Sequence, residues 1–327
     1  MNLYEILQVD RKASSDVIHA AWKALIKNAH PDKGVSADIT ILLNDAKTTL
    51  LDSEKREEYD ADLFKQVGSI IGSYRVLEEI AQGGFGTTYK GEHVKLQAPV
   101  CIKHAHRISH EDEQILANEA NAMWDLSHPF IPTVRDFIVL EDKSCALVTS
   151  YIPGPTLYKV IEKNKRIDSE SGAWICDRVL QALRYLHYHG VVHGDVKPQN
   201  IIVQPEKHTA VLVDYGLSAI KPSHTNKPLG YTPYFASPEQ LKKMPLLPES
   251  DFYSLGMTLI YALGGDVLKK TVPESVPKEF RDFIGKLTFQ NALFRPSWEK
   301  ENLVETLALA REKSFGRRQS NMKKLDY

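Results

Sequence analysis

The sequence is poor in cysteine and has no long apolar run. Its only cysteines, Cys101, Cys145 and Cys176, are too few and too widely spaced for a disulfide framework or a cysteine-based zinc site, and they fit a reducing compartment. No stretch of 18 apolar residues predicts a membrane span. The first residues, MNLYEILQVD, include acidic side chains and lack the apolar core of a secretion signal. We therefore expect a cytoplasmic protein.

Charge of one sign is also not in excess. The 41 Lys and Arg residues are matched by 42 Asp and Glu residues, which leaves a formal net charge of −1. Such a balance gives no global electrostatic reason to expect a nucleic-acid partner. Hydrophobic residues make up 43% and charged residues 25% of the 327 positions, as in ordinary globular proteins, and this length suggests about two domains.

Apolar residues recur with a helical period near the start of the chain. A first run predicts an amphipathic helix, with Ser14 or Ser15 as its cap and its end at His30, because Pro31 disfavours helix in the residue before it. A second run predicts a second helix, antiparallel to the first and joined to it by the polar loop 30–34. The two runs are Val17, Ile18, Ala21, Trp22, Leu25, Ile26 and Ala29, followed by Ile39, Leu42, Leu43, Ala46 and Leu50.

Four short segments flank or join the two predicted helices: Tyr4–Leu7, Ala21–Lys23, His30–Asp32 and Leu51–Asp60. With these segments, residues 1–66 resemble the J domain of DnaJ-type co-chaperones. It implies that the loop residues His30, Pro31 and Asp32 stimulate the ATPase of a DnaK-type chaperone, and that Lys23 and Lys27 help the first helix to dock that chaperone.

The charge of this module departs from the J-domain pattern. Ala24 and Asn28 stand where such helices usually carry cations, and residues 1–66 hold 9 basic and 12 acidic side chains. Docking to an acidic chaperone surface is therefore expected to be weak and sensitive to salt. An alternative is that the helical hairpin serves only as a spacer. Residues 67–72, with two glycines, are expected to link the module to the remainder of the chain.

From Tyr74 the apolar pattern changes to a period of two, with Val76, Leu77 and Ile80, and predicts a strand. The strand leads into a glycine-rich turn at 81–89, whose backbone amides could approach phosphate oxygens closely. A turn of this kind alone would be read as a plain hairpin. An ordered series of motifs comes after it: Val100–Lys103, Glu119, His128–Pro129, His193–Asn200, Asp214–Gly216, Ser237–Glu239, Asp251, Gly256 and Arg295.

This series resembles the protein kinase family over roughly residues 73–310. The resemblance implies an α+β chain: a small helical J domain followed by a bilobal kinase fold, with a β-rich N-lobe at 73–152 and a helical C-lobe at 153–310. It also implies transfer of the ATP γ-phosphate, with Mg²⁺, to protein hydroxyl groups.

The same resemblance implies a role for each site residue. Lys103, paired with Glu119, would neutralise the ATP phosphates, and Asp195 would accept the proton of the acceptor hydroxyl. Lys197 would contact the γ-phosphate and, with the segment 232–234, indicates serine/threonine specificity. Asp214 and Asn200 would bind the metal ions. The nucleotide would further contact Ala81, Gly83, Gly84, Phe85, Gly86 and Thr88. Thr149 would be the gatekeeper, and Ser150, Tyr151 and Ile152 would form the hinge that binds adenine through the backbone.

Other motif residues are expected to be structural. Glu239 and Arg295 should form a buried ion pair, and Asp251 should cap a core helix and hold the catalytic loop. The spacing of 39 residues between Gly256 and Arg295 predicts that a helix usual in the family is trimmed. A zinc site at His104, His106 and His110 is disfavoured, because no carboxylate or cysteine partners are evident.

Gly194 replaces the arginine that usually precedes the catalytic aspartate. That arginine normally holds a phosphate on the activation loop. We therefore expect that activity does not depend on phosphorylation of residues 215–236. Residues 311–327 carry six basic and two acidic side chains. They are expected to form a frayed tail, and autophosphorylation at Ser320 in Arg317–Ser320 is the alternative.

Three functions remain open from the sequence. The favoured one is an active, magnesium-dependent serine/threonine kinase with a chaperone-recruiting module, acting on protein substrates. The second is a pseudokinase adaptor, and the third is a co-chaperone whose kinase fold binds clients. Retention of the complete catalytic set argues against the pseudokinase: Lys103, Glu119, Asp195, Asn200 and Asp214.

Overall fold

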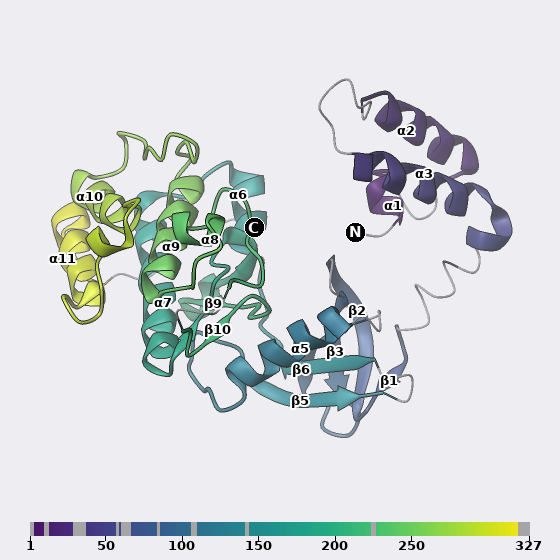
Figure 1. Ribbon diagram of the computed structural model, residues 1–327, viewed down its shortest axis with the longest axis horizontal. Coiled ribbons are helices and arrows are strands. Elements are labelled where there is room, and N and C mark those ends of the chain that lie inside the picture. Colours follow the sequence, from purple (N-terminus) through teal and green to yellow (C-terminus); the bar gives the residue numbers. More distant parts are fainter. Residues whose placement is uncertain are drawn as a thin grey trace. The chain divides into compact units, whose positions relative to one another are not determined.

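The computed structural model describes residues 3–9, 13–28, 37–56, 59, 67–83, 86–105, 110–140, 144–223 and 227–319 (Figure 1). The chain divides into two compact units. The first comprises residues 1–112 and 138–148, and the second comprises residues 113–137 and 149–327. Among the helices within the described residues, none is long and apolar enough to span a membrane.

The N-terminal segment of the first unit is helical, as the periodicity predicts. It contains α1 (Leu3–Ile6), α2 (Ser15–Asn28) and α3 (Ala37–Leu51). The helix α2 begins after Ser14, whose carbonyl accepts the N–H of Ile18 at 3.0 Å. The three helices share a small core that consists of Tyr4, Leu7, Ile18, Leu43, Ala46 and Leu50. Val17, Ile39 and Leu42, which the pattern assigns to the apolar faces, are instead about half exposed.

Polar contacts join the parts of this small helical segment. The indole N–H of Trp22 on α2 donates to Asn44 on α3 at 3.2 Å, and Lys47 lies 3.8 Å above the Trp22 ring. Further along the chain, the guanidinium group of Arg56 donates to the Tyr4 hydroxyl and to the carbonyl of Ala13, both at 2.9 Å. Among the described residues of this segment the core contains six buried apolar side chains, which is small, so these contacts help to fix the helices.

A six-stranded sheet with the order β1-β2-β3-β4-β6-β5 comes next along the chain. Its strands are β1 (Ile70–Ile71), β2 (Tyr74–Gly83), β3 (Gly86–His93), β4 (Pro99–His104), β5 (Val134–Val139) and β6 (Cys145–Ser150). The strand β1 lies within residues 67–72, where the sequence predicts only a linker. It pairs antiparallel with β2, with Ile70 opposite Arg75 and Ile71 opposite Tyr74. Part of the predicted linker therefore belongs to the sheet.

The strand β2 keeps its predicted alternation only at its start. Tyr74 and Val76 are buried in the core of the sheet, whereas Leu77 and Ile80 are about 40% exposed. The pairing of β2 with β3 shifts register between Val76 and Glu78 and again between Glu79 and Ala81. Each such bulge moves the following side chains to the other face, which explains why the apolar pattern fails there.

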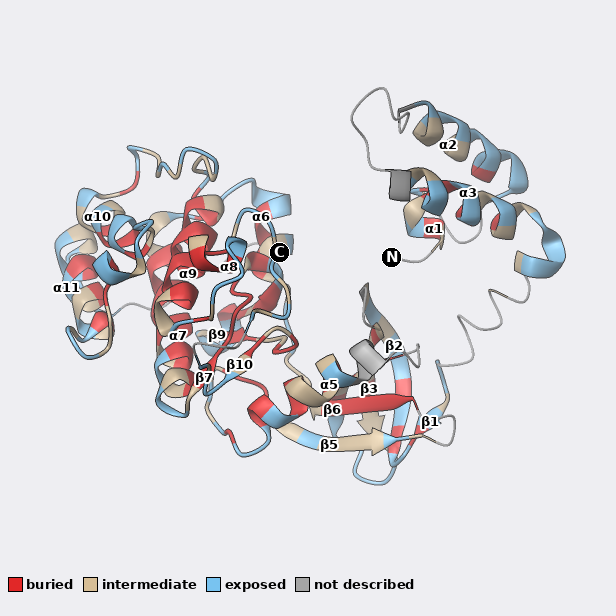
Figure 2. Ribbon diagram, viewed as in Figure 1, coloured by how far each residue is buried: buried red, intermediate tan, exposed pale blue. Residues whose placement is uncertain are grey.

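The second unit is mainly helical. Its helices are α5 (His110–Met123), which begins in the first unit, then α6 (Leu157–Asn164), α7 (Ser169–Tyr188), α8 (Pro238–Leu241), α9 (Pro248–Ala262), α10 (Lys278–Leu287) and α11 (Leu303–Phe315). Four short strands form two antiparallel pairs, β7 (Val191–Val192) with β10 (Ala219–Ile220) and β8 (Ile201–Gln204) with β9 (Thr209–Leu212). Most residues of α7 and α9 are buried (Figure 2). These two helices therefore form the centre of the unit.

The spacing prediction between Gly256 and Arg295 is confirmed. Residues 263–277, which the structure describes throughout, connect α9 to α10 without a helix. A single β-bridge between Asp266 and Thr271 closes this connection.

The C-terminal segment differs from the frayed tail that the sequence predicts at 311. The helix α11 continues to Phe315 and ends at Gly316, whose φ of +73° suits a glycine cap. Beyond the cap, Arg317 donates to the carboxylate of Glu170 at 2.7 and 2.8 Å. The predicted domain boundary at 310 thus falls inside a helix, and Ser320 lies outside the described residues.

Candidate active site

The loop that carries Asp195 is held by the side chain of Asp251. This loop comes after β7 and leads through a 3₁₀ turn at Pro198–Asn200 into β8. The two carboxylate oxygens of Asp251 accept the backbone N–H groups of His193 and Gly194, each at 2.8 Å. Asp251 is fully buried in the first turn of α9. It therefore holds the loop as predicted, but it does not cap the helix, because the N-cap residue is Leu247.

A histidine and a tryptophan that the sequence does not point to complete this support. Nδ1 of His187 lies 2.9 Å from the indole Nε1 of Trp298, and Nε2 of His187 lies 2.8 Å from Asp251. The indole group can only donate, so Nδ1 of His187 accepts and its proton resides on Nε2. The imidazole thus donates to the same carboxylate that holds the loop.

His193 is oriented in the same way. Its Nδ1 accepts the backbone N–H of Asp195 at 3.2 Å, and its Nε2 lies 3.3 Å from the carbonyl of Val213. A backbone N–H can only donate and a carbonyl can only accept, so the proton again resides on Nε2. The ring stacks edge to face on Tyr215, with centroids 4.7 Å apart. His193 therefore joins the Asp195 loop to the segment that carries Asp214.

Asp195, Lys197 and Asn200 come together, as the resemblance implies. Asp195 is 7% exposed, and its Oδ2 accepts from the Lys197 ammonium group at 2.7 Å and from the Asn200 amide at 3.0 Å. The hydroxyl of Thr232 donates to Oδ1 at 2.6 Å and accepts from Lys197 at 2.9 Å. An alcohol O–H therefore already donates to the carboxylate of Asp195, beside a fixed positive charge.

The predicted metal ligands offer oxygen atoms. The Asn200 amide nitrogen donates to Asp195, to its backbone carbonyl at 2.9 Å and to its carboxylate, so the remaining atom of the Asn200 amide is an oxygen acceptor. Asp214 supplies a carboxylate, and its backbone has a φ of +68°, which is uncommon outside glycine. Amide and carboxylate oxygens are the ligands that Mg²⁺ prefers, so these residues fit that ion.

Glu119 on α5 contacts the segment just after Asp214. Its carboxylate accepts the backbone N–H of Tyr215 at 3.2 Å. Burial raises the pKa of the Tyr215 hydroxyl well above its ordinary value, and the charges of Glu119 and Asp251 add to this effect. The hydroxyl of Tyr215 donates to the carbonyl of Leu212 at 3.1 Å. Lys103 belongs to the first unit and Glu119 to the second, so their ion pair stays a prediction.

Three of the predicted nucleotide contacts form a row across the sheet. Ala81 on β2 is paired with Thr88 on β3, and Thr88 is paired with Lys103 on β4. Directly paired residues present their side chains on the same face of a sheet. This face is the more open one, because Thr87 and Ile102, which alternate with the row, are buried. The register therefore presents Ala81, Thr88 and Lys103 together.

The glycine-rich turn needs at least one of its glycines. Gly86 has a φ of +148°, and a Cβ atom there would overlap the carbonyl oxygen of His104. Gly83 is paired with Gly86 at the end of the hairpin, whereas Gly84 and Phe85 lie outside the described residues.

The residues predicted as gatekeeper and hinge lie at the end of β6. Thr149, the predicted gatekeeper, and Ser150 are the last two residues of β6, and Tyr151 and Ile152 come directly after the strand. The backbone N–H of Ser150 donates to the carbonyl of Thr133 at 2.8 Å, and the Ser150 hydroxyl accepts the N–H of Thr133 at 3.0 Å. Any adenine contact of the Ser150 backbone would therefore use its carbonyl.

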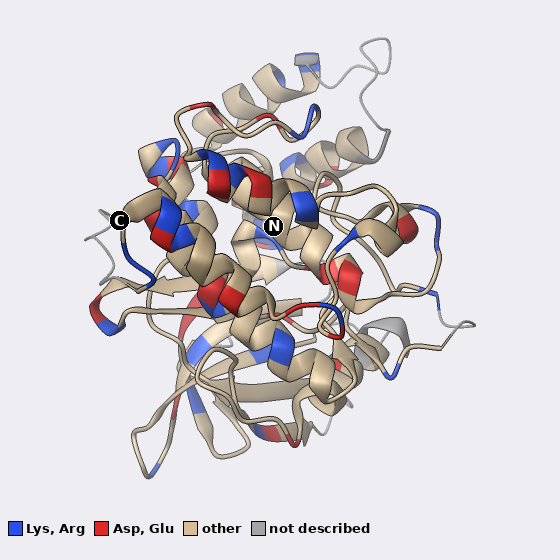
Figure 3. Ribbon diagram, turned by 90° about the vertical axis from the view of Figure 1, so that its left-hand side faces the viewer, with Lys and Arg blue, Asp and Glu red and all other residues tan. Residues whose placement is uncertain are grey.

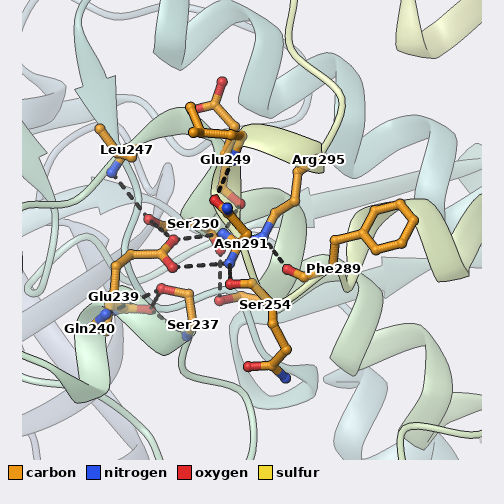
Figure 4. Close-up of polar contacts among 12 residues, drawn as sticks. Ser237, Glu239, Gln240, Leu247, Glu249, Ser250, Ser254, Phe289, Asn291 and Arg295 are labelled. Carbon is orange, nitrogen blue, oxygen red and sulfur yellow. Dashed lines mark hydrogen bonds and ion pairs between the residues drawn. The ribbon is translucent and has the colours of Figure 1, made fainter.

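Arg295 and Glu239 form the predicted buried ion pair (Figure 4). Arg295 is 2% exposed, and its terminal nitrogens donate to the two Glu239 oxygens at 2.6 and 2.9 Å. The other three N–H groups donate to the carbonyls of Phe289, Glu249 and Gln290. All five donors of the guanidinium group are satisfied, which offsets the cost of burying its charge. This pair is structural.

Gly194 could not be replaced by the usual arginine without strain. Its φ is +76°, and a Cβ atom would lie 2.7 Å from the carbonyl oxygen of Leu217. Its own carbonyl accepts from the amide of Gln240 at 2.8 Å, next to the ion pair of Glu239. The loop conformation therefore requires glycine at this position.

The remaining predicted residues lie partly outside the described residues. Lys23 and Lys27 are exposed on α2, four residues apart and thus on one face, whereas His30, Pro31 and Asp32 are not described. His104 is buried and lies 3.0 Å from the hydroxyl of Ser144. His106 and the side chain of His110 are not described, and the described residues hold no group of three His, Cys, Asp or Glu side chains suited to a metal ion.

Comparison with known proteins agrees with this geometry. Residues 74–304 match the protein kinase domain, and residues 2–60 match the DnaJ domain. A probable serine/threonine-protein kinase PknB of Lactococcus lactis is 31% identical over 62% of this chain and 33% of its own length. Serine/threonine-protein kinase pkn3 of Myxococcus xanthus is 31% identical over 62% of this chain and 40% of its own length.

A mammalian protein gives a similar match. Serine/threonine-protein kinase 36 of Mus musculus is 28% identical over 69% of this chain and 18% of its own length. The chain thus spans less than half the length of these curated relatives. The kinase match covers well over half of this chain and includes every motif from Tyr74 to Arg295. The chain therefore belongs to the protein kinase family and carries a DnaJ domain at its N-terminal end.

Proposed function

We propose that this chain is a serine/threonine protein kinase that uses ATP and Mg²⁺. The contact between the Thr232 hydroxyl and the Asp195 carboxylate carries the proposal, because a substrate serine or threonine would present the same O–H group. During transfer, the acceptor oxygen forms a bond to the γ-phosphorus and the bond between the β–γ bridging oxygen and that phosphorus breaks. The acceptor proton passes to Asp195.

The chain's own residues orient this reaction. Asp251 fixes the backbone of the catalytic loop, and Asn200 and Lys197 fix the Asp195 carboxylate. Lys197 also places a positive charge where negative charge gathers on the transferred group. Asn200 and Asp214 would hold the metal ion, which neutralises phosphate charge when bound. Lys103 and Glu119 would position the α- and β-phosphates, next to Ala81 and Thr88.

We further propose that residues 1–66 recruit a DnaK-type chaperone through Lys23, Lys27 and the loop of His30, Pro31 and Asp32. Such recruitment would raise the local concentration of the chaperone or its clients near the kinase site. The three cysteines form no disulfide bond, which supports a reducing compartment such as the cytoplasm.

A phosphate-transfer assay tests the kinase proposal. The purified chain is incubated with γ-labelled ATP and Mg²⁺, and the labelled amino acids are identified after hydrolysis. We expect label on serine or threonine, and a loss of about 10²–10⁴-fold in Asp195→Asn, because the proton acceptor is gone. Asp125→Asn makes the same chemical change at an exposed position and should retain activity. Equal labelling by wild type and Asp195→Asn would overturn the proposal.

A further inference from the structure

The backbone of Gly194 is held at both of its polar groups. Its N–H donates to Asp251 at 2.8 Å, and its carbonyl accepts from the side-chain amide of Gln240, also at 2.8 Å. Asp251 belongs to α9 and Gln240 to α8, and both residues are no more than 1% exposed. The residue directly before Asp195 is therefore fixed by two buried side chains from different helices.

The contact with Gln240 orients the peptide group that leads into Asp195. The carbonyl of Gly194 and the N–H of Asp195 belong to the same planar peptide group. The N–H donates to Nδ1 of His193 at 3.2 Å, and the carbonyl on the opposite side accepts from Gln240. With both ends of the peptide group held, its rotation is prevented.

The amide of Gln240 has one orientation that satisfies its contacts. Its Oε1 accepts the backbone N–H of Ser237 at 3.0 Å and the Ser237 hydroxyl at 3.1 Å (Figure 4), and its Nε2 faces the Gly194 carbonyl. A backbone N–H can only donate and a carbonyl can only accept, so the oxygen must face Ser237. Ser237 is fully buried and comes directly after the segment 215–236. Gln240 thus joins the end of that segment to the catalytic loop.

This link needs neither charge nor modification. A phosphate on residues 215–236 would need cations beside it, but Gly194 has no side chain, and the Lys197 ammonium group already contacts Asp195 and Thr232. Figure 3 views the chain from the side on which α10 and α11 lie, and there basic segments lie next to acidic ones. That side therefore presents mixed charge and not one basic region.

We propose that Gln240 is a positioning residue for phosphate transfer, and that its contact with Gly194 takes the place of a phosphate on the segment 215–236. It acts on Asp195 through the backbone of Gly194. The inference rests on the kinase reaction proposed above. Proton transfer to Asp195 depends on the placement of its carboxylate, so a small displacement of the loop lowers the rate. The folded chain itself supplies the link, so the catalytic loop is held before any phosphorylation.

Initial rates of phosphate transfer by the full chain, measured after phosphatase treatment and removal of the phosphatase, test the proposal. Gln240→Glu keeps an acceptor for Ser237 but replaces the N–H donor by a carboxylate oxygen, which repels the Gly194 carbonyl. We expect kcat to fall at least about tenfold through displacement of the loop. The KM for ATP should stay within about threefold, because no nucleotide contact is changed. The wild type should keep its turnover after the phosphatase treatment.

Gln204→Glu is the matched control. Gln204 is also buried, and its Nε2 donates to a backbone carbonyl, that of Pro153, at 2.5 Å. The substitution makes the same chemical change outside the catalytic loop, so kcat should stay within about twofold of the wild type. Circular dichroism at the assay temperature shows whether each variant is folded. Gln240→Met, which removes the donor without adding charge, replaces Gln240→Glu if that variant unfolds, and its kcat should fall as well.

Three results would overturn the inference. The first is an equal fall of kcat in the Gln240 and Gln204 variants, which would show a general structural effect. The second is a folded Gln240 variant with the kcat of the wild type. The third is a wild type that loses about tenfold in turnover on phosphatase treatment, because a phosphate would then hold the loop. Lack of any transfer by the wild type would instead overturn the kinase proposal on which the inference rests.

Discussion

At the scale of single residues, Gly194 shows how a departure from the family pattern is built into the backbone. The left-handed φ of +76° and the near contact with the Leu217 carbonyl exclude an unstrained side chain at this position. The usual arginine is thus not merely missing, because the loop conformation leaves no place for its Cβ atom.

Gly194→Ala should lower the free energy of unfolding by at least about 2 kcal/mol, through backbone strain and the contact with Leu217. Gly285→Ala provides the control, because Gly285 is in the helix α10 and a Cβ atom there meets nothing within 4 Å. That substitution should stabilise the protein by about 0.5–1 kcal/mol. Urea denaturation of both variants checks the difference, and a Gly194→Ala variant as stable as the wild type would contradict the strain argument.

The buried ion pair of Glu239 and Arg295 should contribute strongly to the free energy of unfolding. Glu239→Gln leaves a buried guanidinium group without its counter-charge and should cost about 3–5 kcal/mol. Asp282→Asn removes an exposed ion pair with Lys278 and should change stability little. Denaturant titration compares the two variants, and similar midpoints for both would contradict the structural role of the buried pair.

The same pair predicts a dependence on pH. Burial by itself would raise the pKa of Glu239, but hydrogen bonds from Arg295 and Ser250 and the charge of Arg295 outweigh it and lower the pKa. A carboxyl group with a lowered folded pKa stabilises the protein above its unfolded pKa of about 4.3 and loses this effect as pH falls through the folded value. The stability difference between wild type and Glu239→Gln should therefore shrink below about pH 4.3 in acid titrations. A difference that stays constant or grows would contradict this sign.

At the scale of elements, we predict that kinase activity does not depend on phosphorylation of the segment 215–236. Ser218 is 2% exposed and donates to the Tyr215 carbonyl at 2.7 Å, so its replacement would disturb structure and is excluded from the test. Ser223→Ala combined with Thr225→Ala should keep turnover within about twofold, because Gly194 offers no cationic side chain for a phosphate. Steady-state transfer rates measure this, and a tenfold fall would show that phosphorylation there matters.

A helix or strand could be predicted from the sequence where its apolar residues recur with one period along its whole length. The helices α2 and α3 follow the 3.6-residue period, and the site residues Asp195, Asn200 and Asp214 lie in short motifs that specify local geometry. The strand β1 was not predicted, because two residues are too few to show a period. The exposure of Leu77 and Ile80 on β2 was not predicted either, because the sequence pattern does not reveal β-bulges.

Long-range partners were harder to predict. His187 and Trp298 are 111 positions apart, and neither belongs to a motif that points to the other. Residues 311–315 continue the helix α11, and Arg317 beyond it pairs with Glu170, which is 147 positions away. A local excess of basic residues is compatible with either a frayed tail or an ion-paired one. The prediction of a frayed tail from composition alone was therefore wrong for residues 311–317.

At the scale of the whole molecule, the DnaJ domain predicts an activity that does not need the kinase site. The full chain should stimulate the ATPase of a DnaK-type chaperone, and His30→Gln should abolish the stimulation while Asp195→Asn leaves it unchanged. Lys23→Glu with Lys27→Glu should weaken it, and raising salt should weaken the wild type, because few cations provide the docking. Stimulation that is equal in wild type and His30→Gln would favour the spacer alternative.

The proposed kinase reaction requires that the chain binds ATP together with Mg²⁺, and that Lys103 and Asp214 each contribute to this binding. Binding of ATP to the full chain, measured by calorimetry with and without Mg²⁺, tests it most directly. We predict that Mg²⁺ strengthens binding by the wild type, that Asp214→Asn loses this enhancement, and that Lys103→Met weakens binding about tenfold or more. ATP affinities that are the same for all three proteins, with and without the metal, would contradict the proposed roles of Lys103 and Asp214.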